Sequence, residues 1–296
     1  RDAVSGHAER AVQLGAVDAV GTDPDAEMTF VAVPPSVLVE EIERSLAEST
    51  GIVTDTGSVK TVVASSITNA RFVAGHPMAG SEQDGVDGAD PDLFVGNRWV
   101  LTPGPDSADD SLRRLQVVLT SLGADVVTMT PARDDRLVAV VSHVPHLTAA
   151  ALMALADDRA LDDSPLLRLA AGGFRDMTRV AAGHPGIWLD ICSQNDVAIV
   201  AVLDEFISRL GDVKSMVASG DRDAMSALLS KARAARINLP DRNMHPQDLL
   251  EIRVPIPDRP GQIAAITMLA ADCEVNVADI EMAHSAEGER GVLVLV

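Results

Sequence analysis

The chain has 296 residues, a formal net charge of −20 at pH 7 and 47% apolar residues. This length exceeds what one ordinary hydrophobic core serves, so two or three domains are expected. The acidic balance argues against nucleic acid or an anionic membrane as a partner, because both attract basic surfaces. An anionic substrate is compatible with it, since a local group of arginines can override the overall field. No apolar run in the sequence approaches the ~20 residues of a membrane span.

Residues 1–129 alternate short β-rich runs with helical stretches, which predicts an α/β domain with a doubly wound parallel sheet, Rossmann-like and dinucleotide-binding. Ser36 is expected to cap one of the helices. Such a domain normally begins with a strand, G-x-G-x-x-G and a helix, and this sequence has no such motif. We therefore expect the first strand, loop and helix to be missing from the N-terminus. The expected helices lie at 8–14, 36–46, 59–67 and 112–122, and the expected strands at 27–33, 52–53, 72–74, 99–102 and 126–129.

Residues 130–235 change to nearly continuous helix, and we expect an all-α domain that dimerises and closes a cleft. Pro145 is expected to kink its first helix. Residues 236–247 carry two prolines and little periodicity, which predicts a linker. Residues 248–296 predict a β-α-β-β unit, an incomplete α+β domain of ferredoxin-like type. The four expected helices of the all-α domain span 134–155, 166–182, 187–210 and 213–235.

The two cysteines, Cys192 and Cys273, fall in different predicted domains. We expect both to be reduced and buried rather than bridged, which suits a cytoplasmic protein. No signal peptide is recognisable, and the first residues resemble the middle of a domain.

The stretch Gly75-His76-Pro77-Met78-Ala79-Gly80 follows a short apolar run, and is expected to be a polar loop at a strand end. In an open α/β sheet such loops gather at the carboxyl ends of the strands, where ligands bind. A histidine held between glycine and proline is poorly suited to filling a core. We therefore predict that His76 is the catalytic centre.

Five motifs follow one another between residues 50 and 200: Asp55-x-Gly-Ser-x-Lys60, Phe72-x-x-Gly-His-Pro-Met-Ala-Gly-x-Glu82-x-x-Gly85, Ser142-His143-Val-Pro-His146, Gly172-Gly-Phe-Arg-Asp-x-Thr-Arg179 and Trp188-x-x-Ile-Cys-x-x-Asn195. In order and spacing they resemble the prephenate dehydrogenase family. Residues 249–296 resemble an ACT domain, an amino-acid-binding module fused to some members of that family.

This resemblance implies oxidative decarboxylation of prephenate to 4-hydroxyphenylpyruvate on the route to tyrosine, by a homodimer. NAD is the implied hydride acceptor, and NADP stays open because the residues that decide between them are expected to precede Arg1. The resemblance also implies feedback regulation by an amino acid, with tyrosine as the natural effector.

The reaction requires a proton acceptor, because the ring hydroxyl loses its proton as hydride leaves the same carbon. A histidine titrates near neutrality and suits this role, which we assign to His76. The alternative for His76 is a turn histidine bonded to backbone. Ser58 resembles the family's hydroxyl partner to the same substrate oxygen, and Ser58 could also be the N-cap of the next helix.

The family pattern places the cofactor along two loops of the sheet domain. Lys60 is equally compatible with an ordinary solvated helix lysine. Trp188 and Asn195 also match the pattern, although a tryptophan at this helical spacing is more often a core residue. The predicted cofactor-binding residues are Val33, Pro34, Pro35, Asp55, Thr56 and Gly57.

Prephenate carries two carboxylates, so a planar bidentate donor is expected. Arg179 matches the family's carboxylate-binding arginine, with Asp176 one helical turn earlier to orient it; the alternative is an ordinary surface pair. His143 and His146 are predicted to line the substrate pocket, with core histidines as the alternative. Glu82 resembles a gating residue, or is an exposed loop glutamate. Neither spacing nor neighbours suggest a metal site.

In the C-terminal unit Asp258, Gly261 and Asn276 resemble the effector-binding turn of ACT domains, with an unliganded dimerising module as the alternative. Other functions also stay open. Arogenate has an amine where prephenate has a ketone, and an acidic pocket group facing that amine would favour it. Another hydroxyacid dehydrogenase would need a catalytic lysine, and residues 130–200 contain no lysine. A non-catalytic amino-acid sensor on the same scaffold is the third alternative.

Overall fold

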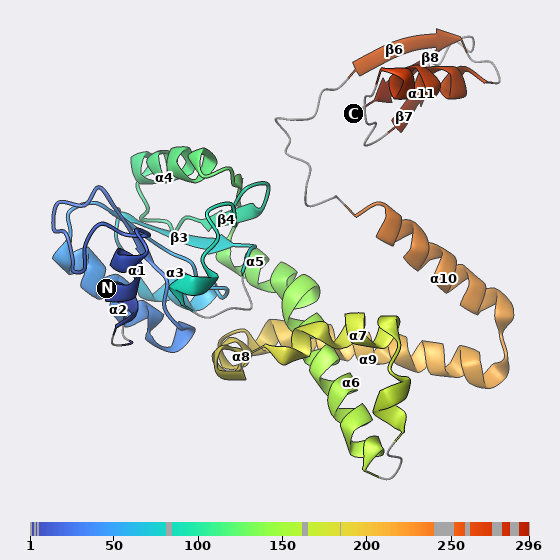
Figure 1. Ribbon diagram of the computed structural model, residues 1–296, viewed down its shortest axis with the longest axis horizontal. Helices are drawn as coiled ribbons and strands as arrows, with labels where there is room; N and C mark the ends of the chain where they lie inside the picture. The colour runs from blue at the N-terminus through green and yellow to red at the C-terminus, as the bar shows by residue number, and fades with distance from the viewer. Residues whose placement is uncertain are drawn as a thin grey trace. The chain divides into compact units, whose positions relative to one another are not determined.

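The computed structural model describes residues 2, 4, 6–80, 85–161, 165–183, 185–239, 252–257, 261–273, 280–284 and 290–295. The contacts within the chain divide it into two compact units, Arg1–Leu239 and Pro240–Val296. Figure 1 shows that the first unit contains both the sheet domain and the long helices α5 to α10.

The sheet of the first unit has five strands in the order β1-β2-β3-β4-β5. Neighbouring strands are parallel, as expected, except β3 and β4, which are antiparallel. Parallel neighbours need a crossover, usually a helix. Between β3 and β4 the described residues hold only a short 3₁₀ turn, Val86–Gly88. The strands are Met28–Val31, Ile52–Asp55, Phe72–Pro77, Arg98–Thr102 and Asp125–Thr128.

Both faces of the sheet are covered by helices. On one face Leu38 and Ile42 of α2 pack with Val53 of β2, and on the other Leu115 and Leu119 of α4 pack near Trp99 of β4. Strand side chains alternate between the faces, so one short strand can contribute to both cores. The helices of this domain are α1 (His7–Gln13), α2 (Pro35–Glu48), α3 (Thr61–Ser66) and α4 (Asp109–Ser121).

The start of α2 differs from the expected serine cap. Pro34 occupies the N-cap position and Pro35 is the first helical residue, which suits a residue that has no N–H to donate. The main-chain N–H of Ser36 donates instead to Oδ2 of Asp190, 3.1 Å away on α8. Nε2 of Gln194 donates to the carbonyl of Pro35 at 3.0 Å. The helical part of the chain thus caps a helix of the sheet domain.

The first helical segment is a bent rod made of α5 (Pro131–Val138), a π-helical turn (Ala139–His143) and α6 (Val144–Ala160). We expected a kink at Pro145, and the irregularity lies directly before it. Pro145 has no N–H to give to the carbonyl one turn earlier, so an α-helical bond is lost there. Wide turns of this kind are frequent at functional sites.

The later helices end at other positions than expected. A bend of 94° at Asn195 separates α8 (Pro185–Gln194) from α9 (Asp196–Ser219), and α10 (Arg222–Ile237) follows after Gly220. The expected break near residue 211 was wrong, because Gly211 lies inside α9. Gly220 adopts φ 67°, which a glycine reaches without strain. Two 3₁₀ turns (Leu166–Leu169 and Arg179–Ala182) flank α7 (Gly172–Thr178).

The helices α9 and α10 leave most of their surface exposed. Ile199 is the one fully buried residue of α9, and none is buried in α10. An apolar groove of about 490 Å³ lies between α6, α7 and α9 and includes Val140, Leu152, Met177 and Phe206 in its lining. The segment Pro131–Ala160 is long and apolar enough to cross a membrane by length and composition. Asp134 and Asp135 of this segment are buried and bond to the sheet domain.

The second unit has the expected β-α-β-β order: β6 (Ile252–Pro257), α11 (Gln262–Asp272), β7 (Ile280–His284) and β8 (Arg290–Leu295). Its strands are antiparallel in the order β6-β8-β7. Gly261 precedes α11 with φ 88°. Asp258 and Asn276 lie outside the described residues.

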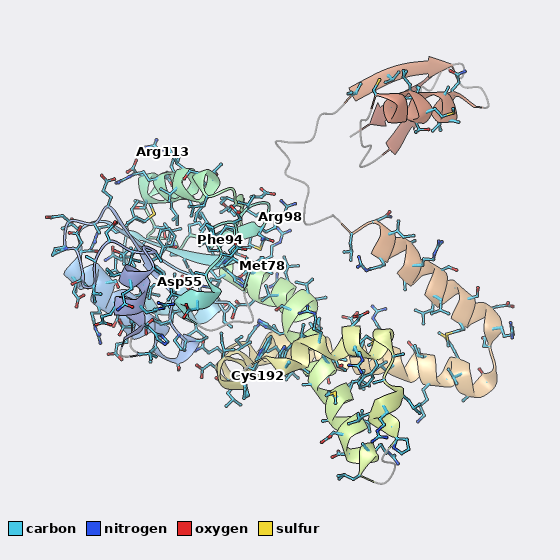
Figure 2. The ribbon with its side chains drawn as sticks, viewed as in Figure 1. Asp55, Met78, Phe94, Arg98, Arg113 and Cys192 are labelled. Carbon is cyan, nitrogen blue, oxygen red and sulfur yellow. The ribbon has the colours of Figure 1, made fainter. Side chains whose placement is uncertain are left out.

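Both cysteines are free thiols, as expected. Cys192 lies on α8 and is half-buried (Figure 2), whereas Cys273 is exposed. The expectation that both are buried was therefore wrong. Cys273 directly follows the last residue of α11, where the helix ends at the surface.

Candidate active site

His76 lies near the carboxyl end of β3, with its side chain 8% exposed. We expected it in a loop; that was wrong, because Gly75, His76 and Pro77 all pair with β4. Its Nδ1 atom lies 2.9 Å from Oδ2 of Asp134, a buried carboxylate in the first turn of α5. A carboxylate accepts only, so Nδ1 carries the proton and Nε2 keeps a lone pair. The pair therefore forms an oriented proton acceptor.

Asp134 was missed at the level of sequence. It lies 58 positions after His76, and no local pattern joins the two. The sequence carries one signal, because Asp134 and Asp135 open a segment that is otherwise largely apolar. Both are buried in the structure. Buried carboxylates need partners, so this pair could have been marked as candidates for a site.

Lys60 and Asp55 form a fully buried ion pair next to His76. Nζ of Lys60 also donates to the carbonyl of Gly75 at 2.8 Å. The Asp55 carboxylate accepts from the N–H groups of Gly57 at 2.9 Å and Gly75 at 3.1 Å. The alternative of a solvated lysine is thus excluded. Asp55, whose position at the end of β2 is labelled in Figure 2, is engaged inside the protein and shapes the loop that follows it.

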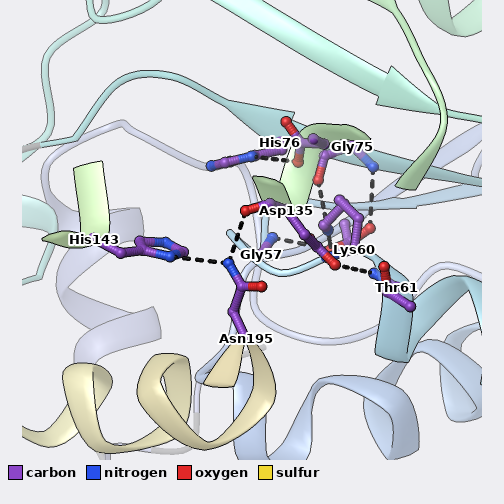
Figure 3. Close-up of polar contacts among 10 residues, drawn as sticks. Gly57, Lys60, Thr61, Gly75, His76, Asp135, His143 and Asn195 are labelled. Carbon is purple, nitrogen blue, oxygen red and sulfur yellow. Dashed lines mark hydrogen bonds and ion pairs between the residues drawn. The ribbon is translucent and has the colours of Figure 1, made fainter. Parts of the chain in front are cut away.

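Asp135 joins the helical part of the chain to that loop. Its carboxylate accepts from the N–H groups of Lys60 at 2.7 Å and Thr61 at 2.9 Å, at the start of α3. Asn195, at the bend between α8 and α9, donates from Nδ2 to the main-chain oxygen of Asp135 at 2.9 Å. The same nitrogen lies 3.1 Å from Nδ1 of His143. Figure 3 shows this chain of bonds running from His143 to the sheet domain.

His143 and His146 lie against the ring of Trp188. His143 meets it edge-on with centroids 6.1 Å apart, and His146 stacks on it at 3.6 Å. Burial and then the neighbouring His76 lower the pKa of His143 to about 4, although Asp135 and Asp134 oppose the shift. Burial also lowers the pKa of His146. Both imidazoles are therefore neutral at pH 7, where they bond as donor and acceptor rather than as cations.

Ser58 lies between β2 and α3, and its hydroxyl oxygen is buried without a hydrogen-bond partner in the described part of the chain. It does not cap α3, because Lys60 holds the N-cap position and Asp135 accepts from the first N–H groups. A Cβ atom on the adjacent Gly57 would lie 2.5 Å from the side chain of Leu38. A buried unpaired hydroxyl is costly unless a ligand or water completes it. The loop therefore fits a bound ligand.

The predicted cofactor residues lie at one edge of the sheet. Val33, Pro34 and Pro35 follow β1, and Thr56 and Gly57 follow β2, its parallel neighbour. In α/β sheets this edge binds ligands. Pro35 is buried as the first residue of α2, and Pro34 is exposed. These two loops and the buried hydroxyl of Ser58 thus lie at this edge of the sheet.

The structure places Arg179 and Asp176 on the exposed surface of the helical part. Arg179 opens the 3₁₀ turn that packs on α6. Gly183 follows this turn, and a Cβ atom there would lie 3.3 Å from the His146 ring. Glu82 lies outside the described residues. His76, His143 and the Ser58 loop are thus held by one network of bonds, and the turn of Arg179 borders it through His146.

Two family models match the chain: prephenate dehydrogenase, nucleotide-binding domain, over residues 1–128, and prephenate dehydrogenase, dimerization domain, over residues 130–231. A prephenate dehydrogenase of Bacillus subtilis is 31% identical over 96% of this chain and 80% of its own length. The chain belongs to the prephenate dehydrogenase family.

Solved structures agree with this family. The prephenate dehydrogenase from Aquifex aeolicus, in complex with hydroxyphenyl propionate and NAD⁺, superposes with a TM-score of 0.74 at 27% identity, covering 79% of this chain and 85% of that one. An arogenate dehydrogenase from Synechocystis gives a TM-score of 0.67 at 30% identity, over 79% and 88%. The family models end at residue 231, so the second unit lies beyond them.

Proposed function

We propose that this chain is an NAD-dependent prephenate dehydrogenase, which converts prephenate to 4-hydroxyphenylpyruvate and CO₂. The observation that carries the mechanism is the bond between His76 and Asp134, because it leaves Nε2 of a buried imidazole ready to take a proton. The hydroxyl proton of the substrate passes to this nitrogen while the same ring carbon loses its hydride and becomes a carbonyl carbon. The bond to the ring carboxylate breaks, CO₂ leaves, and the electron pair of that bond makes the ring aromatic, so that the carbonyl oxygen takes up a proton and becomes the phenol hydroxyl of the product. When bound, NAD⁺ supplies the hydride acceptor.

We assign the remaining residues from their chemistry. Ser58 offers its unpartnered hydroxyl to the substrate oxygen that loses its proton. Arg179, oriented by Asp176, binds a carboxylate at the exposed mouth of the site, where a planar guanidinium forms two parallel bonds. His146 contributes a neutral wall stacked on Trp188. Glu82 gates the pocket.

The second unit is proposed to be a regulatory ACT domain that binds an amino acid, with tyrosine as the effector. Its β6-β8-β7 sheet beside a single described helix and the positive φ of Gly261 at the turn before α11 support this. Asp258 and Asn276 would complete the effector site. The exposed helices α9 and α10 support a homodimer. The free thiols of Cys192 and Cys273 agree with a reducing cytoplasm.

The test is the absorbance of reduced cofactor when the chain meets prephenate or arogenate, each with NAD⁺ or NADP⁺, with and without tyrosine. We expect turnover of prephenate with NAD⁺ and inhibition by tyrosine. Preference for arogenate would move the assignment to the second substrate. Absence of turnover with either substrate would favour a non-catalytic sensor.

The variant His76→Asn makes the test specific to the proton acceptor. We expect kcat to fall about 10²–10⁴-fold, because the substrate hydroxyl loses its base while the binding surface stays. His7→Asn is the matched control, since His7 lies on α1 with a half-exposed side chain. Unchanged kcat in His76→Asn would remove His76 from the mechanism.

A further inference from the structure

The two buried histidines of the site have opposite partners at the same ring nitrogen. Nδ1 of His76 faces the carboxylate of Asp134, which only accepts hydrogen bonds. Nδ1 of His143 faces the side-chain amide of Asn195 at 3.1 Å. In the described part of the chain this is the only hydrogen bond of the His143 side chain. Which ring nitrogen of His143 carries the proton therefore depends on whether Nδ1 faces the NH₂ group or the oxygen of the Asn195 amide.

The orientation of the Asn195 amide follows from its second partner. The main-chain oxygen of Asp135 can only accept, so the amide group 2.9 Å from it must be the NH₂ end. Figure 3 shows both bonds leaving the same Asn195 atom. An NH₂ group has two hydrogens, one for each partner. The amide oxygen at this position would instead face the Asp135 carbonyl and be repelled.

We propose that Asn195 is a positioning residue that fixes His143 as the neutral tautomer with its proton on Nε2. Nδ1 of His143 must keep its lone pair to accept from the amide, so the proton lies on the other ring nitrogen. Protonation of Nδ1 would place two donors against each other. Asn195 therefore also opposes the imidazolium form of His143.

The consequence is a division of roles between two imidazoles that are close enough for one to shift the pKa of the other. His76 presents a lone pair at Nε2 and accepts a proton. His143 presents an N–H at Nε2 and donates a hydrogen bond to an oxygen atom of the substrate. This second role rests on the proposed function, whereas the tautomer rests on the bonds of Asn195 alone.

The surroundings of His143 decide how pH acts on it. The charged or titratable groups that influence it are His76 on β3 and Asp134 and Asp135 on α5, and Trp188 on α8 presents an uncharged ring edge. The two aspartates favour a positive charge, and burial and His76 oppose it. Replacing the Asn195 amide by a carboxylate would add a third favourable group directly at Nδ1 and tip this balance.

The decisive measurement is ¹⁵N NMR of the full chain with labelled histidine side chains, the His143 signals being assigned by their loss in His143→Gln. In the unaltered chain at pH 7 we expect His143 to show a protonated Nε2 and an unprotonated Nδ1. In Asn195→Asp we expect the reverse, because the new carboxylate accepts from Nδ1–H. A protonated Nδ1 in the unaltered chain would overturn the proposal, even if the variant fails to fold.

The second readout is the pH profile of kcat/KM with prephenate. In Asn195→Asp we expect the acidic limb to move up by about one to two pH units, because an adjacent carboxylate favours the imidazolium. Ser193→Asp is the control, since it adds the same charge at an exposed position two residues earlier. An unmoved limb together with an unmoved tautomer would refute the positioning role. Inactivity of the unaltered chain would instead refute the proposed function and leave the NMR result standing.

Discussion

The bond between Asp134 and His76 joins the helical part of the chain to the end of β3, and it orients the imidazole for the role of base that we propose for it. Asp134 is 2% exposed at its side chain, so its charge is little screened. In the proposed mechanism it holds the imidazole in one tautomer and stabilises the cation that forms on proton transfer.

Asp134→Asn tests this role at the scale of one atom. We expect kcat to fall by about 10²–10⁴-fold with little change in KM, because an amide can hold His76 in the wrong tautomer. Steady-state kinetics of this variant, of His76→Asn and of the double variant check it. The decreases in kcat of the two single variants should not add in the double variant, since both disrupt the same pair of His76 and Asp134. Additive losses would mean that Asp134 acts independently of His76.

The lowered pKa of His143 leads to a prediction about the stability of the chain. Its pKa is about 4 in the folded chain and 6.5 in the reference state, so the unfolded chain binds the extra proton first as pH falls. The contribution of the neutral His143 to the free energy of unfolding is therefore complete above pH 6.5. It is lost as the pH falls toward 4, and the loss is up to about 3 kcal/mol. Urea unfolding at pH 7 and pH 5 should show a smaller pH dependence in His143→Gln. If the free energy of unfolding changed equally between the two pH values in both proteins, this would contradict the lowered pKa of His143.

At the scale of elements, the close approach of β2, β3 and β4 depends on Gly75. A Cβ atom there would lie 2.7 Å from the carbonyl of Asp55, and 2.9 Å from both the Thr54 hydroxyl and the Trp99 indole nitrogen. Backbone and indole cannot yield without moving a strand. The glycine is therefore part of how the sheet places His76.

Gly75→Ala should lower the free energy of unfolding by about 1–3 kcal/mol, as overpacking does, and should reduce kcat as well. Gly80→Ala is the matched control, because a Cβ atom at Gly80 meets nothing within 4 Å among the described residues. Thermal unfolding and kinetics of both variants check this. Equal stability of the two would show that the strands adjust at no cost.

The elements themselves were largely predictable, because apolar periodicity decides which face is buried. Each expected strand is found, as are the helices around the sheet. Helix ends were less predictable where they depend on tertiary contacts. The bend lies at Asn195, whose amide bonds to Asp135 and His143, partners far away along the chain. The stop at Gly220 was available from the sequence and was placed too early.

At the scale of the molecule, α9 carries apolar side chains that the single chain leaves exposed. Val200 is 55% exposed and Ile207 is 62% exposed. A second copy that covers these side chains and the apolar groove beside α9 would remove this surface from water. The family model that matches this region is named for dimerization.

Ile207→Asp should convert the dimer to a monomer, because a carboxylate in an apolar interface is costly to desolvate. Sedimentation velocity gives the association state. Val117→Asp is the control, since Val117 is 66% exposed on α4 in the sheet domain. A dimer that survives Ile207→Asp, or a monomeric unaltered chain, would place the interface elsewhere or remove it.

The site was predictable in part. His76 and the loop from Asp55 to Lys60 carry motifs whose residues stay close along the chain. Asp134 and Asp135 became visible only in three dimensions, because their partners lie 58 and 75 positions away. Asn195 ends the fifth motif, but its bond to His143, 52 positions away, needed the structure. Single residues far apart in a sequence leave no spacing to interpret, so the second half of the network needed the fold.

The π-helical turn from Ala139 to His143 changes the direction in which α6 presents its side chains relative to α5. In a regular α-helix, the eight steps from Asp135 to His143 would place these two residues about 80° apart around the helix axis. The wider turn advances less per residue and recovers most of that angle. One amide at Asn195 can therefore reach both. Deleting one residue between Ala139 and Ser142 would restore a regular helix, rotate α6 against α5 and move the His143 ring out of line with the Asn195 amide, without altering either of these two residues.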